Sequence, residues 1–569
     1  MKYDIRQIPF SARGSYVTIM LSKDNQLAIR TASDFGLFKS DKAADIFTIR
    51  PGVDSPTNAK VKCTPYELVY KKGESKLKIH FYNAETLLFS WKGYPLTFAS
   101  EQSINLVKHP AGYLLSLHRS GCYYAFVKPI NAKIKTDIKI PIKSKTIISH
   151  RVSLTFIPDD NSTVNLAVKV SRYEKSAFPS ANIDYEKSLR KARKNWEWSK
   201  RKLPEISARY KNTRDLAWYS LWGNLVTSEG RFKRETNLCS KYIMSAIWSW
   251  DNCFGALGFL PFEPELARDQ ILTIFDRQAK DGMLPDGITD EREFRFGTKP
   301  PVHGWTILKF IKEKKAPLKF IKEIYSPLIK WTRWWLDNRD YDRDGIYQYN
   351  LSNESGWDNN TVFNKGMPVE APDLNAYLAL QMEAISKMSS LLGKTKVAEE
   401  WMRESKTLIK RLIEHSWDSD KGIFISYRDS IHDYEETDSL MGVMPLVLGS
   451  RLPKEIIDKM TKKLMDTDTL MSKYGPVTVS LKDSAFDPAC YWRGSIWAPT
   501  VYLLHDGLVS AGKNKEAEII ARRFITLVSK NKGMFEDYNP LTGEGNDNAC
   551  YNWTGAVTLI FLLDYYVSA

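Results

Sequence analysis

The sequence predicts a multidomain protein in which an N-terminal antiparallel β-sandwich is followed by an all-α (α/α)6 barrel. The chain has 569 residues, more than one hydrophobic core usually supports. Apolar residues alternate with a period of two from about Ser15 to Val170, and from about Ile206 they recur at helical spacing. The expected domains are residues 1–182 for the sandwich, 183–205 for a linking helix and 206–569 for the barrel.

The first part of the chain has the pattern of many short strands. Leu77, Ile79 and Phe81 alternate with polar residues, and residues 164–170 repeat this alternation. Glycine, asparagine, aspartate and proline interrupt such runs, as they do between antiparallel strands. The stretch from 184 to 201 is rich in Lys, Arg, Glu and Ala and lacks Gly and Pro, which predicts an exposed linking helix.

The remaining residues predict helices in sequential pairs. One helix is expected between Pro372 and Gly393, which are typical of a helix start and a helix end. Its apolar positions are Leu374, Tyr377, Leu378, Met382 and Ile385. Twelve helices are expected, starting near residues 207, 246, 263, 300, 318, 371, 395, 436, 453, 491, 514 and 551. Such pairs form inner and outer rings, and the loops at one end of the barrel frame a pocket.

The composition argues against nucleic-acid and membrane partners. The formal net charge is +15, but the basic residues are interleaved with acidic ones, and the basic stretch Lys128–Lys145 alternates with isoleucines like a strand with a solvated face. No stretch reaches the ~18 apolar residues of a membrane span. Residues 1–14 lack the apolar run of a signal peptide, so we expect a cytoplasmic protein, or a periplasmic or secreted one if a signal was removed.

The cysteines predict no disulfide framework. They are widely scattered and have no CxxC spacing, so free thiols are expected. They are Cys63, Cys122, Cys239, Cys253, Cys490 and Cys550. The sequence makes no prediction of oligomeric state.

The segments between the predicted helices concentrate Trp, Gly and acidic residues. They are WSWDNCF (248–254), DGMLPDGI (281–288), KPPVHGW (299–305), ESGWDNN (354–360), YWRGSIW (491–497) and FEDYNPLTGEG (535–545). A Trp beside an acid in a loop suggests an apolar platform next to a hydrogen-bond acceptor. A pyranose stacks its C–H face on an aromatic ring while its hydroxyls bond to carboxylates and Arg, so these loops indicate a carbohydrate ligand.

Cleavage of a glycosidic bond needs two carboxyl groups, one protonated and one ionised. Asp358 lies between Trp357 and Asn359, where an apolar ring would raise its pKa and keep it protonated. Glu536 follows Phe535 in another loop. Either acid could instead cap a helix or close a turn.

The chain resembles glycoside hydrolase family 63 and its trehalase-like relatives. The resemblance rests on an ordered set of motifs over most of residues 240–560: WSWDNCF, PPVHGW, ESGWDNN, DLNAYL (373–378), YWRGSIW, YNPLTGEG and NWTGA (552–556). It implies an (α/α)6 barrel behind a β-domain, inversion of configuration and mainly α-glucosidase activity, with some members acting on α-mannosides such as mannosylglycerate. The implied activity is exo-acting hydrolysis of α-linked oligosaccharides.

The same resemblance assigns roles to individual residues. Asp358 matches the general acid and Glu536 the general base of the family. The expected pocket residues are Trp250, Asp251, Trp305, Trp357, Arg493, Trp497, Tyr538 and Trp553, with inner-helix packing as the alternative role of each Trp. Two departures put glucose specificity in doubt. Lys299 stands where relatives often have Gln, and Ser495 stands where they have Pro. Lys299 is expected either to contact a carboxylate or phosphate of the substrate or to point into solvent.

The mechanism expected from these residues requires no redox cofactor or nucleotide. Asp340, Asp342 and Asp344, followed by Gly345, resemble the start of a calcium loop. The expected Glu at the twelfth position is replaced by Leu351, so a structural Ca²⁺ would need an acid from elsewhere; the alternative is a plain Asp-rich turn.

Three other functions remain open at this point. A glycoside phosphorylase shares the architecture but needs only one protein carboxylate. A sugar-binding module would keep the Trp platforms without needing either acid. An isomerase or epimerase would use histidine, but only His303 lies in one of these loops. The enzyme could also act on a different sugar, such as mannose, galactose or a charged one.

Overall fold

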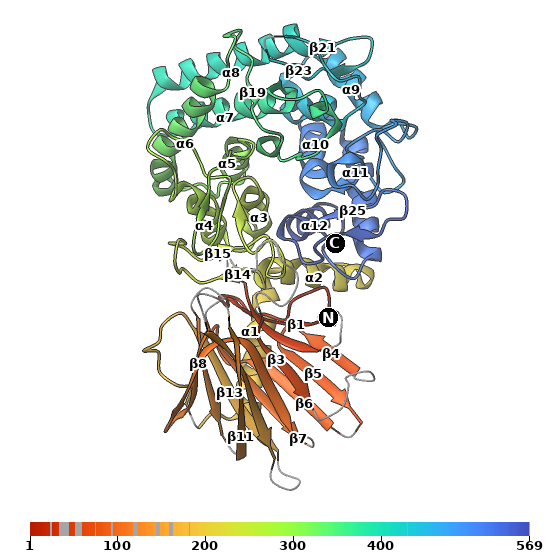
Figure 1. Ribbon diagram of the computed structural model, residues 1–569. Helices are drawn as coiled ribbons and strands as arrows, with labels where there is room; N and C mark the ends of the chain where they lie inside the picture. Colours follow the sequence, from red (N-terminus) through yellow and green to blue (C-terminus); the bar gives the residue numbers. More distant parts are fainter. Residues whose placement is uncertain are drawn as a thin grey trace. The chain divides into compact units, whose positions relative to one another are not determined.

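The computed structural model describes residues 1–22, 26–32, 45–51, 60–73, 75–92, 95–117, 123–130, 133–143, 148–158, 163–180, 182–429 and 431–567 (Figure 1). It divides into two compact units. The first comprises Met1–Leu203, Trp218–Ala246 and Thr289–Arg292, and the second comprises Pro204–Ala217, Ile247–Ile288 and Glu293–Ala569. Cys122 lies outside the described residues, and the other five cysteines are free thiols.

The first unit is built from antiparallel strands. Those in the described part of the chain are β1 (Val17–Leu21), β2 (Leu27–Thr31), β3 (Asp45–Pro51), β4 (Lys60–Thr64), β5 (Glu67–Lys72), β6 (Ser75–Phe81), β7 (Thr86–Lys92), β8 (Leu96–His109), β9 (Gly112–Leu117), β10 (Tyr123–Pro129), β11 (Lys133–Lys143), β12 (Ile148–Ile157) and β13 (Val164–Ser171). Their order is β1-β2-β3-β8-β9-β10-β13-β7-β6-β5-β4, and β12 joins β11 to β8.

This sheet encloses one hydrophobic core. Ile79 on β6 faces Phe89 on β7, and the alternating residues of nearly every other strand enter the same core. Ile19 of β1 and Leu68 of β5, far apart in the strand order, also belong to it. The sheet therefore bends round its own apolar face, and the predicted sandwich is one continuous hydrogen-bonded sheet.

The predicted linking helix is α1 (Tyr185–Ser199). It begins where the Asp184 side chain accepts a hydrogen bond from the Lys187 amide. Tyr185 packs against Leu88 and Ala167 of the sheet. One side of the helix therefore packs on the first unit, while most of its other residues are exposed.

The second unit contains the expected series of helices. They are α2 (Lys211–Trp222, shared with the first unit), α3 (Asp251–Phe259), α4 (Pro264–Phe275), α5 (His303–Lys312), α6 (Leu318–Asn338), α7 (Pro372–Leu391), α8 (Thr395–Ser416), the 3-10 helix η6 (Leu440–Arg451), α9 (Lys454–Leu464), α10 (Ala498–Ser510), α11 (Asn514–Lys530) and α12 (Asn552–Tyr565). The eighth predicted helix is 3-10, with Pro445 inside it and a non-helical Gly449.

Every second helix belongs to an inner ring. α3, α5, α7, η6, α10 and α12 contact one another in this order, and α12 contacts α3 to close the ring. α4, α8, α9 and α11 pack outside as partners of inner helices. The inner helices are apolar nearly all round, as in α3, where every residue is buried. The prediction of a β-domain followed by an (α/α)6 barrel is confirmed.

The barrel arrangement brings the Trp- and acid-rich loops together. Because inner and outer helices alternate, the inner helices run in one direction and their first residues lie at the same end. The motifs precede inner helices that begin at Asp251, His303, Ala498 and Asn552. Within the described residues, no helix has the length and apolar character needed to cross a membrane.

Candidate active site

Two asparagines fasten the loop that carries Asp358. The Asn359 side chain donates to the Cys490 carbonyl at 3.2 Å and accepts from the Trp492 amide at 2.9 Å. The Asn360 amide group donates to the Trp492 carbonyl at 3.0 Å. The motif sequence WDNN therefore fixes Asp358 against the turn at 490–492.

Glu536 is held in the interior of the barrel end. It precedes β25 (Asp537–Tyr538), which pairs with β24 (Ile496–Trp497). Its side chain is only 4% exposed, and Tyr491 donates a hydrogen bond to Oε1 at 3.1 Å. Its backbone carbonyl accepts from the indole of Trp553 on α12 at 2.9 Å. The carboxyl is thus fixed from both its side chain and its backbone.

The surroundings of Glu536 shift its pKa upward. Burial raises its pKa well above the ordinary value, and the carboxylates of Asp537 and Asp547 raise it further, whereas the Tyr491 hydrogen bond lowers it. Burial likewise raises the pKa of Asp537 to about 7, although hydrogen bonds from Ser495 and Asn546 lower it. Proton affinity is therefore high at the buried side of this site.

Asp358 has a different environment. Its side chain is 40% exposed, and the ammonium group of Lys299 lies 3.8 Å from Oδ1. Trp357, expected to provide an apolar surface for this carboxyl, packs against Trp492 with the rings tilted by 41° and their centroids 4.9 Å apart. A cation and solvent therefore shape the surroundings of Asp358 more than an apolar ring does.

Lys299 does not point into solvent. Its side chain is 9% exposed, its Nζ donates to the Asn353 carbonyl, and it lies 3.4 Å from Oδ1 of Asp286. Burial lowers the Lys299 pKa, but the Asp358 and Asp286 carboxylates outweigh this effect and raise it. Burial raises the pKa of Asp286 to about 6, although Lys299 opposes the rise.

Tyr491 contacts Glu536 and lies in the turn that holds the Asp358 loop. It was absent from the residues predicted from sequence. Its hydroxyl donates to Glu536, and burial raises its pKa, with smaller contributions from the Glu536 and Asp358 carboxylates. Its backbone has φ of +55°, a left-handed conformation that is strained for tyrosine and recurs at functional sites. The available signal was its position at the start of YWRGSIW.

The tryptophans of the motifs form a packed cluster. Trp492 and Trp497 stack face to face at 3.9 Å, and Trp250 meets Trp553 edge to face at 5.9 Å. With Trp357, these rings are 0–3% exposed. A sugar platform must present a ring face, so the cluster mainly supports the loops, and Trp492 at its centre was missed from sequence.

The remaining predicted pocket residues are distributed differently. Asp251, at the start of α3, accepts from the Tyr551 hydroxyl at 3.0 Å and acts electrostatically on both Glu536 and Lys299. The Tyr538 hydroxyl instead accepts a hydrogen bond from the Phe535 amide at 3.1 Å.

Two predicted pocket residues are not in this group. Trp305 donates its indole N–H to Asp506 at 2.7 Å and packs beside Phe254 and Tyr502 in the barrel core. Arg493 donates to Asn364 at 2.8 Å on the exposed side of its loop.

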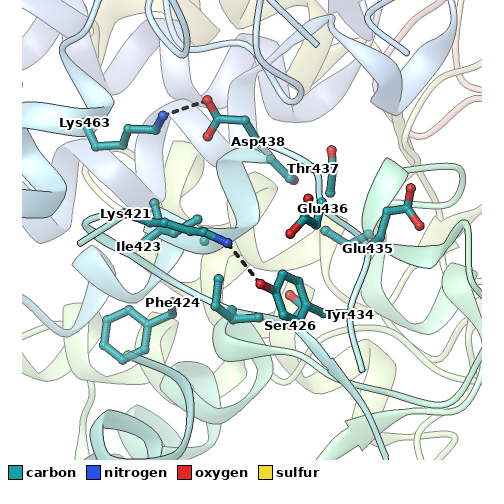
Figure 2. Close-up of a pocket in the computed structure, with 14 residues that line it drawn as sticks. Lys421, Ile423, Phe424, Ser426, Tyr434, Glu435, Glu436, Thr437, Asp438 and Lys463 are labelled. Atoms are coloured by element: carbon teal, nitrogen blue, oxygen red, sulfur yellow. Dashed lines mark hydrogen bonds and ion pairs between the residues drawn. The ribbon is translucent and has the colours of Figure 1, made fainter. Parts of the chain in front are cut away.

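The cavity in Figure 2 has a volume of about 370 Å³ and is lined by none of these acids. Lys421 reaches Tyr434 across it, and Lys463 pairs with Asp438. It touches the Asp358 loop through Ser439, whose hydroxyl donates to Asn360 Oδ1 at 2.9 Å. The cavity therefore neighbours the candidate site without containing its carboxyls.

Residues 244–554 match the model of the mannosylglycerate hydrolase MGH1-like glycoside hydrolase domain. The chain belongs to this family, within glycoside hydrolase family 63. Mannosylglycerate hydrolase MGH1 of Selaginella moellendorffii is 22% identical over 393 residues, covering 55% of this chain and 80% of the relative.

Solved structures show the same fold. The family 63 mannosylglycerate hydrolase of Thermus thermophilus in complex with glucose aligns with a TM-score of 0.53 at 20% identity, covering 62% of this chain and 99% of that one. A bacterial glucoamylase in complex with acarbose aligns with a TM-score of 0.64 at 13% identity, covering 98% and 94%. The second match includes the β-domain as well as the barrel.

Membership of the MGH1-like family makes the chain a glycoside hydrolase. It decides against a sugar-binding module, a phosphorylase and an isomerase. The histidine that an isomerase would need in these loops, His303, is fully buried, and burial lowers its pKa to about 4.

Proposed function

We propose that this enzyme hydrolyses an α-linked hexosylglycerate with inversion, using Asp358 as general acid and Glu536 as general base. The observation that carries the proposal is the turn at 490–492, which holds the Asp358 loop through Asn359 and Asn360 and bonds to the Glu536 carboxyl through Tyr491. Two carboxyls held by one turn can both act on a single glycosidic bond. Inversion requires them ~6.5–9.5 Å apart, with room for a water on one face of the sugar.

The difference in exposure supports the assignment of roles. A general acid must reach the leaving-group oxygen, which lies toward the open side when a chain end enters a pocket. Asp358 is the more exposed of the two acids. Glu536 is buried, where it would activate a water behind the sugar ring. Its raised pKa makes the ionised form a strong base, at the cost of requiring a higher pH to ionise.

The choice of substrate rests on the relatives. The family model and the Selaginella and Thermus proteins carry the name mannosylglycerate hydrolase. The formal net charge of +15 would favour encounter with a carboxylate-bearing substrate. Lys299 is already paired with two carboxylates, so another group would bind the glycerate. The α-glucosidase activity on neutral oligosaccharides expected from sequence is the competing assignment.

A proton NMR time course tests both reaction and substrate. The panel comprises α-mannosylglycerate, α-glucosylglycerate and α-linked glucose disaccharides, each with and without phosphate. We expect a hexosylglycerate to give the β-anomer first, independently of phosphate. An initial α-anomer would contradict inversion, and preferential cleavage of the neutral disaccharides would contradict the glycerate assignment.

The roles of the two acids are separated with Asp358→Asn and Glu536→Gln. An α-glycosyl fluoride needs little help from a general acid, because fluoride leaves without protonation, but it still needs a base. Asp358→Asn should therefore retain turnover of the fluoride while losing turnover of the glycoside, and Glu536→Gln should lose both. The reverse pattern would exchange the roles. Exposed Asp468, paired with Lys482, supplies the control Asp468→Asn.

A further inference from the structure

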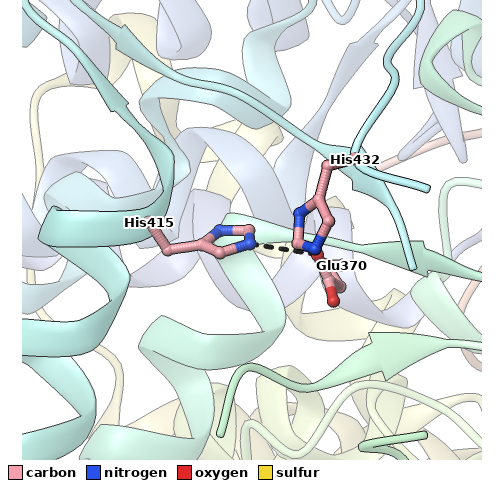
Figure 3. A group of neighbouring side chains, drawn as sticks. All are labelled: Glu370, His415 and His432. Carbon is pink, nitrogen blue, oxygen red and sulfur yellow. Dashed lines mark ion pairs between the residues drawn. The ribbon is translucent and has the colours of Figure 1, made fainter. Parts of the chain in front are cut away.

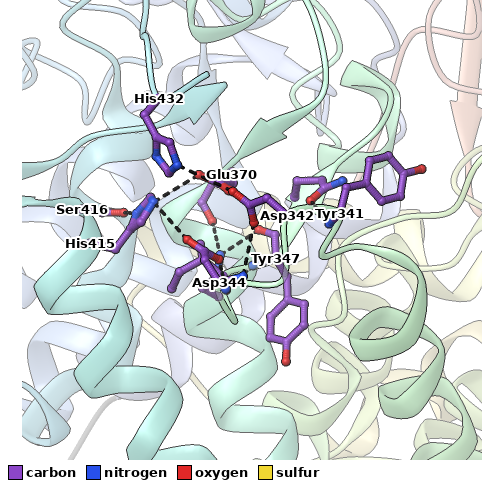
Figure 4. Close-up of polar contacts among 12 residues, drawn as sticks. Tyr341, Asp342, Asp344, Tyr347, Glu370, His415, Ser416 and His432 are labelled. Atoms are coloured by element: carbon purple, nitrogen blue, oxygen red, sulfur yellow. Dashed lines mark hydrogen bonds and ion pairs between the residues drawn. The ribbon is translucent and has the colours of Figure 1, made fainter. Parts of the chain in front are cut away.

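A second group of acids lies outside the catalytic carboxyls. The carboxylates of Asp340, Asp342 and Asp344 gather within 4.8 Å of one another, and those of Asp342, Glu370 and Asp429 do the same. Asp342 is common to both groups, so five carboxylates converge from three separate parts of the chain. Figure 4 shows the turn at 341–347 directed toward Glu370.

Glu370 distinguishes this group from an acidic surface turn. It lies on β20 (Val369–Glu370), between β19 (Gln348–Tyr349) and β23 (Tyr427–Arg428). The residue is 1% exposed. Its Oε2 lies 3.1 Å from Nε2 of His415, and its Oε1 has no hydrogen-bond partner in the described part of the chain (Figure 3). A buried carboxylate oxygen without a donor is costly unless a cation neutralises it.

We propose that Asp340, Asp342, Asp344, Glu370 and Asp429 bind a structural Ca²⁺. Ca²⁺ takes six to eight oxygen ligands in flexible geometry, which suits a set made of several carboxylates. Two backbone-to-carboxylate hydrogen bonds hold the turn in place. The Asp344 amide donates to Asp342 at 3.2 Å, and the Ile346 amide donates to Asp344 at 2.7 Å. Glu370 supplies the acid that is missing at Leu351.

The neighbouring histidines orient the ligands. His415 Nε2 faces Glu370 and lies 3.6 Å from Asp344, and His432 Nε2 lies 3.6 Å from Asp342. An imidazole N–H on the outer oxygen of a ligating carboxylate fixes its direction and leaves the other oxygen for the metal. Five carboxylates outnumber the two imidazoles, which favours Ca²⁺ over Zn²⁺.

The site has a structural consequence for the connection between α6 and α7. That connection begins at Arg339 and ends at Ala371, and Asp358 lies in its middle. A cation shared by Asp342 near its start and Glu370 near its end closes it as a loop, which reduces the conformations open to the segment that carries Asp358. Asp429 attaches the segment after α8 to the same point.

The test is calcium binding by the chelator-treated protein, measured by titration calorimetry and by thermal unfolding with added CaCl₂. We expect one site per chain and a rise in Tm of about 2–4 °C when CaCl₂ is roughly 100 to 1,000 times the dissociation constant, as a ligand selective for the folded state produces in a chain of this size. Absence of heat and of a Tm shift would overturn the proposal. A shift with ZnCl₂ but not with CaCl₂ would overturn the choice of ion.

The variants Glu370→Gln and Asp342→Asn locate the site. Each should lose the calcium-dependent shift. In the absence of calcium, Glu370→Gln should be at least as stable as wild type, because it removes one of five converging carboxylates that repel one another without the cation. The matched control is Asp337→Asn, an exposed acid at the end of α6 that is outside the group. Retention of the full shift in both ligand variants would also contradict the proposal.

Discussion

The hydroxyl of Tyr491 donates a 3.1 Å hydrogen bond to Oε1 of Glu536. This bond lowers the pKa of a carboxyl that burial and neighbouring acids raise. If Glu536 is the general base, Tyr491→Phe should lower kcat roughly 10²-fold, the range for loss of one well-placed catalytic hydrogen bond.

The same variant should also change the pH profile. Without the bond the Glu536 pKa rises, so the acid limb of kcat/KM should move to higher pH in Tyr491→Phe. The control is Tyr434→Phe, which removes the hydroxyl that meets Lys421 beside the Figure 2 cavity. An unchanged acid limb would show that Tyr491 does not act through Glu536.

Lys299 should be required for stability. It separates the Asp286 and Asp358 carboxylates, and Lys299→Gln would leave them without a buried cation. We expect a loss of ~3–5 kcal/mol in the free energy of unfolding, as when one partner of a buried pair is removed. Chemical denaturation measures this loss, and exposed Lys482→Gln should leave the free energy of unfolding almost unchanged.

Asp373 should make the enzyme less stable as the pH rises. Burial raises its pKa from 3.8 to about 7, with the Tyr349 hydroxyl 3.3 Å from Oδ2. A carboxyl with a raised folded-state pKa contributes stability that is complete below its unfolded pKa and is lost as the pH rises through 7.

Asp373→Asn removes this contribution because it does not titrate. The difference between the Tm of Asp373→Asn and the Tm of wild type should therefore increase by about 2–4 °C from pH 4 to pH 8. Parallel Tm profiles of the two proteins over this range would contradict the assigned pKa.

The stacked pair of Trp492 and Trp497 should be a major source of stability at the barrel end. Trp492→Ala would open a cavity beside Trp357 and Trp497, and we expect a loss of ~3–5 kcal/mol in denaturant unfolding. Trp198, which is 60% exposed, supplies the control Trp198→Ala, with an expected change within ~1 kcal/mol. If Trp492→Ala is as stable as wild type but loses substrate binding, the ring is a sugar platform after all.

The helices and strands and their order along the chain could be predicted from residue patterns alone. Period-two alternation and helical periodicity are local properties of side-chain direction, so the strands, the helix pairs and the placement of Asp358 and Glu536 in loops before inner helices followed from residue spacing. The eighth helix was located correctly in order, but its 3-10 form follows from Pro445 and Gly449 in their packed context.

The contacts between side chains of different segments could not be predicted in this way. Three contacts join residues from different loops and helices. Lys299 is buried beside acids, Tyr491 donates a hydrogen bond to Glu536, and Trp305 donates one to Asp506. Glu370 meets the Asp340–Asp344 turn because β20 pairs with β19, which no spacing rule for a calcium loop predicts. Such contacts depend on how the ring of helices closes, and periodicity fixes the face of each helix without fixing its neighbours.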